Sequence, residues 1–170
     1  MSLIDKTYFV GILSIPHLSA TEGVDSSLDN STELLRQIAI QEPKFLKEIL
    51  GDLYAEYVAH KTDAIWVTFE GKLKDATLHR SPIANYVFFN SYPDLCVSNT
   101  GVGTIASKNE NGIDVTPQRL VNVWNDMVNQ LTVEDGILDY LEENSSLYET
   151  DDLSLPDWYY ITRYINIFGI

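Results

Sequence analysis

The residue types best suited to catalysis in this chain are three histidines and one cysteine. His17, His60 and His79 lie far apart in the 170-residue sequence and share no spacing typical of metal ligands. Cys96 is the single cysteine, so it has no partner for an internal disulfide, and no local pattern marks it as a nucleophile. We therefore expect the imidazoles to be surface or core side chains and Cys96 to be a small buried residue.

Two glycine-containing segments match ligand-binding loops only in part. Thr100-Gly-Val-Gly103 lacks the Gly-Lys-Ser/Thr of a phosphate-binding loop, so its glycines predict turns instead. Ser107 to Gly112 resembles the start of a calcium loop, but Gln118 stands where a bidentate glutamate is required. The sequence thus predicts no catalytic, metal or cofactor site, and we expect the protein not to be an enzyme. An enzyme would require a deep polar pocket that joins His60 or His79 to two carboxylates.

The charge of the chain is strongly acidic. Twenty-five Asp and Glu stand against eleven Lys and Arg, which gives a formal net charge of −14. Between Glu134 and Asp157 there are nine acids and no base. Binding to nucleic acid depends on Lys and Arg that displace counterions, so specific nucleic-acid binding is not expected. The acids indicate either a solvated face that keeps the protein soluble, or a surface that repels DNA or meets a basic partner.

Helix start signals recur along the chain and predict a mainly all-α fold. Asn30-Ser31 is a cap, and Glu42-Pro43, Ser81-Pro82, Thr116-Pro117 and Pro156 each place a proline where a helix tolerates it. Apolar residues at helical spacing follow each signal. We therefore predict a compact multi-helix domain over residues 31–170, without a segment long and apolar enough to span a membrane. The core is predicted within residues 45–57, 83–87 and 120–131.

Two segments lack helical spacing. Residues 1–30 contain strand formers followed by Pro16 and a polar stretch, which predicts an extended N-terminal arm. Residues 93–115 form a long loop rich in Gly and Asn, and loops of this length are usually functional or mobile. Val102 to Ala106 and Ile113 to Val115 are predicted to pair as a β-hairpin within it.

The chain resembles a family of small prophage proteins of Bacteroides-type bacteria. The resemblance covers nearly the whole chain and lies in structural motifs, none of them catalytic. These motifs are Tyr8-Phe-Val-Gly11, Ile15-Pro16, Glu42-Pro-Lys-Phe-Leu46, Leu50-Gly51, Ser81-Pro-Ile-Ala-Asn-Tyr-Val87, Thr100-Gly-Val-Gly103, Trp124-Asn-Asp-Met127 and Asn166-Ile-Phe-Gly-Ile170. That family is similar in turn to the head–tail connector (adaptor, head-completion) proteins of tailed bacteriophages. One departure is Pro93, which is expected to shorten the helix that such proteins use as a long central element.

The resemblance implies a homo-oligomeric ring that carries DNA through its channel and binds portal and tail-completion proteins. Its location would be the bacterial cytoplasm during assembly and then the head–tail junction of the virion. The arm, the hairpin and an aromatic cluster are the expected contact regions, with interface residues Tyr8, Phe9, Val10, Ile12, Val102, Ile105, Ile113, Trp158, Tyr159 and Tyr160. An acidic lumen is expected from Glu134, Asp135, Asp139, Glu142, Glu143, Asp151 and Asp152. The alternative is an acidic inhibitor or DNA mimic that occupies a basic site on another protein.

Overall fold

The computed structural model describes residues 2–15, 18, 30–95, 97–100, 103–106 and 117–145. Its elements, in chain order, are the 3-10 turns η1 (Lys6–Tyr8) and η2 (Gly11–Leu13), the helices α1 (Ser31–Leu50), α2 (Leu53–Ala59), α3 (Ala64–Lys72) and α4 (Pro82–Leu95), the strands β1 (Val97–Thr100) and β2 (Gly103–Ala106), and the helices α5 (Pro117–Thr132) and α6 (Ile137–Ser145). The predicted fold class, a mainly all-α multi-helix domain, is confirmed. The predicted helix after Pro156 lies outside the described residues.

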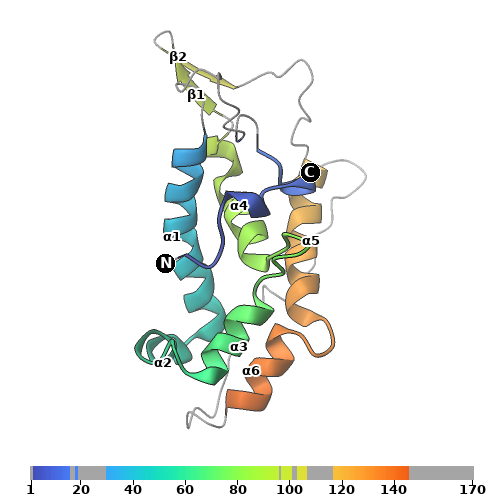
Figure 1. Cartoon of the computed structure of the whole chain (residues 1–170). Coiled ribbons are helices and arrows are strands. Elements are labelled where there is room, and N and C mark those ends of the chain that lie inside the picture. The colour runs from blue at the N-terminus through green and yellow to red at the C-terminus, as the bar shows by residue number, and fades with distance from the viewer. Residues whose placement is uncertain are drawn as a thin grey trace.

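The three long helices α1, α4 and α5 stand side by side, with α4 in the middle (Figure 1). The shorter α2, α3 and α6 lie at one end of these helices, and the β1–β2 hairpin lies at the other. Every residue from Ser81 to Phe88 is buried, because α4 is covered by its two neighbours and by the arm. Helix α5 buries one stripe, formed by Val123, Trp124, Met127, Val128 and Leu131. An apolar helix inside and amphipathic helices around it are the expected division of a single core.

The helix starts predicted at prolines are correct in two places and wrong in one. Helices α4 and α5 begin at Pro82 and Pro117, and the Ser81 hydroxyl accepts a hydrogen bond from the amide of Ile83 at 3.2 Å. Pro43, however, lies inside α1 and does not start a new helix. A proline there removes the hydrogen bond to the carbonyl of Ala39. Ala39 and Pro43 are both on the exposed side of α1. Water can therefore donate a hydrogen bond to the Ala39 carbonyl, and the helix continues.

Glycine and proline also mark the ends of two helices. Gly51 caps α1 with φ of 52°, which glycine adopts without a steric cost. Pro93 was expected to shorten the central helix, and α4 ends at Leu95, two residues beyond it.

The N-terminal arm lies across the bundle and contributes to its core. Its described residues, 2–15, 18 and 30, contain no α-helix or strand, and the turns η1 and η2 lie within residues 2–15. The first turn contacts α1, and the second contacts α4 and α5. Its buried apolar side chains are Leu3, Ile4, Tyr8, Phe9, Leu13 and Ile15.

The long loop after α4 contains a hairpin, as predicted, but with a different partner strand. Strand β2 occupies the predicted position, while its antiparallel partner is β1, which precedes it, with Ser98 opposite Ile105. The predicted partner, Ile113 to Val115, lies outside the described residues. A strand directly before the turn is the nearer partner, and short loop closure favours it.

Candidate interaction surfaces

Two buried charged side chains hold the arm by its backbone. The Glu42 carboxylate on α1 accepts hydrogen bonds from the amide of Leu3, at 2.9 and 3.1 Å, and from the hydroxyl of Ser2, at 2.6 Å. The Arg119 guanidinium on α5 donates to the carbonyls of Ile12, at 2.7 Å, and Ser14, at 2.9 Å. Apart from the bond from the Ser2 hydroxyl, these charge-assisted hydrogen bonds join the backbone of the arm, which they hold at Leu3, Ile12 and Ser14.

The predicted interface residues of the arm divide into an inner and an outer pair. Tyr8 and Phe9 are buried in the chain's own core, and Tyr8 packs edge-on against His79, with ring centroids 5.8 Å apart. Val10 and Ile12 point outward and are 52% and 42% exposed. In this conformation, therefore, Val10 and Ile12 are accessible to a neighbouring subunit, while Tyr8 and Phe9 are buried in the core of their own chain. The sequence missed this division because the turns η1 and η2 break the alternation of an extended strand.

The predicted residues of the loop and of the C-terminal aromatic cluster are placed only in part. Ile105 lies in β2. Val102, Ile113, Trp158, Tyr159 and Tyr160 lie outside the described residues, as do Asp151 and Asp152 of the predicted acidic lumen.

The other predicted lumen acids lie together on the surface around α6. Glu134 and Asp135 are exposed in the turn before the helix, and Asp139, Glu142 and Glu143 are exposed on it. Asp135 has φ of 57°, and the Asp139 carboxylate accepts a hydrogen bond from its amide at 2.9 Å. The Lys72 ammonium group donates to the carbonyl of Asp135 at 2.8 Å, which ties this turn to α3.

A polar network inside the bundle joins α4 to α5. The buried Asn85 amide donates to the carbonyl of Val123, at 2.8 Å, and to the carboxylate of Asp126, at 3.0 Å. Gln130 and Arg80 donate to the same carboxylate at 2.8 and 2.7 Å. The sequence pattern gave one usable sign of this network, since Asn85 interrupts the apolar face of α4.

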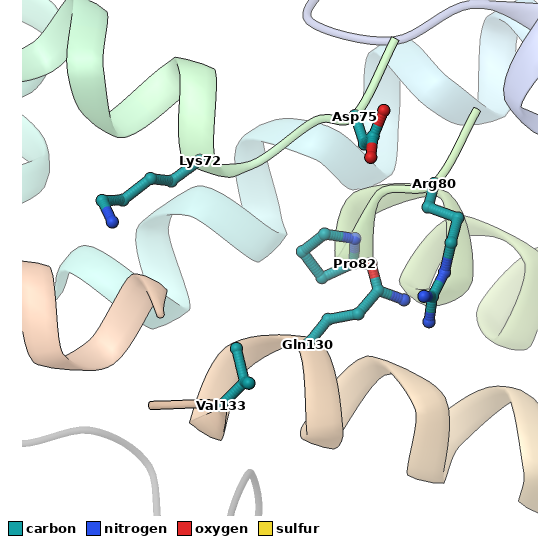
Figure 2. A pocket seen from close by; sticks show the side chains of 6 residues that line it. All are labelled: Lys72, Asp75, Arg80, Pro82, Gln130 and Val133. Carbon is teal, nitrogen blue, oxygen red and sulfur yellow. The ribbon is translucent and has the colours of Figure 1, made fainter. Parts of the chain in front are cut away.

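An open pocket of about 160 Å³ lies beside this network, lined by Lys72, Asp75, Arg80, Pro82, Gln130 and Val133 (Figure 2). The Lys72 side chain points away from Arg80, so the two cations do not converge on one point. The Asp75 carboxylate accepts hydrogen bonds from the amides of Thr77 and Leu78, at 2.8 and 2.9 Å. The lining residues therefore offer no nucleophile with an adjacent base, which acyl or phosphoryl transfer would need.

The histidines within the described residues do not form a pocket with carboxylates. His60 lies 3.6 Å from Glu56 and 3.9 Å from Asp63, but all three side chains are about half exposed. His79 lies in an exposed turn with φ of 50°. His17 and Cys96 lie outside the described residues. Among the residues that the structure describes, no group of three His, Cys, Asp or Glu is placed to hold a metal ion.

No protein-family model, no curated protein and no solved structure matches this chain. In the described ranges, moreover, no helix has the length and apolar character needed to cross a membrane.

Proposed function

We propose that this protein is a structural subunit that assembles with copies of itself, in the manner of the connector ring between the head and tail of a tailed phage. Its partners in that role are neighbouring subunits and the portal and tail-completion proteins. It acts in the bacterial cytoplasm during assembly and then in the virion.

The observation that carries the proposal is the β1–β2 hairpin. It stands beyond the end of the helical bundle (Figure 1), and in the described part of the chain each strand pairs only with the other. A two-stranded hairpin is marginal by itself in water, and each of its outer edges offers unpaired amides and carbonyls. Addition of a strand from a neighbouring subunit completes such an edge.

Two further features support the same role. Val10 and Ile12 leave an apolar strip on the outer side of the arm. The chain carries a net charge of −14, and an anionic surface makes no counterion-releasing contacts with phosphates. DNA that passes through an assembly of such subunits would not adhere to it.

The test is mass measurement by light scattering over a concentration series, with negative-stain images of any large species. A closed ring is the expected result. A matched variant replaces residues 98–105 with a Gly-Ser linker of equal length, which removes the strands and keeps α4 and α5. We expect this variant to keep the helical circular dichroism of the wild type and to lose the large species. A wild-type protein that stays monomeric at every concentration argues against self-assembly.

The alternative function is inhibition of a nucleic-acid-binding protein by mimicry of DNA. The observation that favours it is the uniform acidity of the exposed residues on α6. A pull-down against host and phage proteins separates the two functions, since a complex that DNA displaces supports mimicry.

A further inference from the structure

Helix α1 presents a cationic and apolar face on an otherwise acidic protein. Its exposed residues are Thr32, Leu35, Arg36, Ala39, Ile40, Pro43, Lys44 and Lys47, which include three cations and no acid. The three acids of the helix, Glu33, Glu42 and Glu48, are all at least half-buried. The sequence of α1 is balanced in charge, so this asymmetry arises from the way the helix is turned.

Each of the three acids has a hydrogen-bond partner, and the partners of Glu42 and Glu48 lie on other elements and turn these two carboxylates away from the exposed face. Glu42 holds the arm, and Glu48 accepts a hydrogen bond from the hydroxyl of Tyr86 on α4 at 3.3 Å. Glu33 accepts from Arg36, at 2.6 Å, and from Gln37, at 2.8 Å. These two donors hold the pKa of the Glu33 carboxyl below its usual range.

The face combines apolar area with three cations, of which Arg36 pairs with Glu33 at 2.6 Å and Lys44 and Lys47 do not pair with a carboxylate among the described residues. Leu35 and Ile40 are 50% and 36% exposed. The ammonium groups of Lys44 and Lys47 have no hydrogen-bond or ion-pair partner among the described residues. An exposed apolar patch flanked by charges of one sign is typical of a surface that meets a complementary partner.

Helix α6 and the turn before it offer that complement. Between residues 137 and 144, where burial is described, the exposed residues of the helix are Asp139, Glu142 and Glu143, all acids at i, i+3 and i+4, so they share one face. Val133, 57% exposed, supplies an apolar side chain just before them. Asp139 and Glu142 are separated by about 4.5 Å along the helix axis, and so are Lys44 and Lys47, because both pairs are three residues apart.

The two surfaces lie on different sides of one molecule. In Figure 1, α1 runs along one side of the bundle, and α6 lies at the opposite side of its lower end, next to α3 and α5. One copy therefore cannot join its own surfaces in this arrangement, but two copies can. Contact between two different patches is head-to-tail, and it generates a ring when the rotation between copies closes.

We propose that copies of this chain associate by packing the exposed face of α1 on one copy against the acidic face of α6 on the next. Leu35 and Ile40 meet Val133, while Lys44 and Lys47 meet Asp139, Glu142 and Glu143. The proposal deepens the self-assembly proposed above and rests on it. It also gives the acids of α6 a place at a subunit contact, in contrast to the channel position predicted from the sequence.

The test uses charge exchange in the full-length protein. One variant carries K44E and K47E, a second carries D139K and E142K, and a third combines all four substitutions. The matched control, K6E with K74E, changes the net charge as much as the first variant but lies outside both helices. Association is followed by sedimentation velocity at an ionic strength of about 0.01–0.1 M, where charges act over about 10–30 Å.

We expect the first and second variants to self-associate at least about tenfold more weakly than the wild type, because like charges then face each other. The third variant, and an equimolar mixture of the first two, should recover association, since both restore opposite charges at every contact. Recovery also shows that the substituted chains remain folded. The control variant should associate like the wild type.

The outcomes separate this inference from the proposed function. If the wild type assembles and the first variant assembles equally well, the α1–α6 contact is wrong while self-assembly stands. If self-association of the first variant and of the control is weakened to the same degree, then only net charge matters, and the proposed contact is also wrong. If the wild type stays monomeric throughout, both the contact and the proposed self-assembly fail.

Discussion

The attachment of the arm by Arg119 is the contact whose loss should have the clearest local effect. Arg119 is 8% exposed, and its guanidinium lies 5.1 Å from the ring of Phe88 as well as donating to the carbonyls of Ile12 and Ser14. Substitution R119M keeps the apolar stem and removes the charge and the donors. Both carbonyls then lose a strong donor at a largely covered site.

The magnitude follows from these contacts. Each hydrogen bond to a charged donor contributes about 1.5 kcal/mol at the low end, and a cation over an aromatic ring adds about 0.5–1 kcal/mol. The docked arm should therefore lose about 3.5–4 kcal/mol of stability. Because every 1.4 kcal/mol is a factor of ten, the arm amides should exchange about 300–700-fold faster.

Hydrogen exchange followed by NMR measures this directly. The reporters are the amides of Leu13 and Ser14, which donate to the carbonyls of Val10 and Gly11 at 3.0 and 3.1 Å. The matched control is R80M, which removes an exposed ion pair to Asp126 and should cost less than about 1 kcal/mol. Unchanged exchange at the two reporters in R119M, or an equal change in R80M, would refute the role assigned to Arg119.

Three further predictions concern the bundle. Substitution N85L should lower the free energy of unfolding by about 2–3 kcal/mol in urea titrations, because the carbonyl of Val123 loses its buried donor; a change below about 0.5 kcal/mol would contradict this. Substitution G51A should cost about 1 kcal/mol in the same assay, because φ at this position is 52°, and a neutral result would mean that the helix end rearranges. Burial, aided by the nearby carboxylate of Glu48, raises the pKa of Tyr86 to about 12, above its ordinary value of 10.0. The folded state then holds this proton more tightly, so the Tyr86 contribution to stability is complete below pH 10 and is lost between pH 10 and 12. Substitution Y86F should flatten that part of the stability–pH curve, and identical curves for the two proteins would count against the shift.

The candidate surfaces could be predicted from the sequence only where they depend on composition. The run of acids that begins at Glu134 predicted an acidic surface. Helix α6 exposes its acids because its apolar residues Ile137, Leu138 and Leu141 face the core. The cationic face of α1 could not be predicted in this way. It exists because Glu42 and Glu48 turn toward the arm and α4, and those partners are 39 and 38 residues away in sequence.

The sequence by itself determined what depends on near neighbours. The proline starts of α4 and α5, the glycine end of α1 and the apolar stripe of α5 each follow from steric limits or hydrogen bonds within a few residues. Tertiary structure decided that α1 continues through Pro43. Because Ala39 is exposed, water can donate a hydrogen bond to its carbonyl in place of the amide that proline lacks. It also decided that Tyr8 and Phe9 point inward, because Glu42 and Arg119 bind the arm by hydrogen bonds from helices α1 and α5, which are distant from the arm in sequence. Such contacts join residues tens of positions apart, and no local pattern contains them.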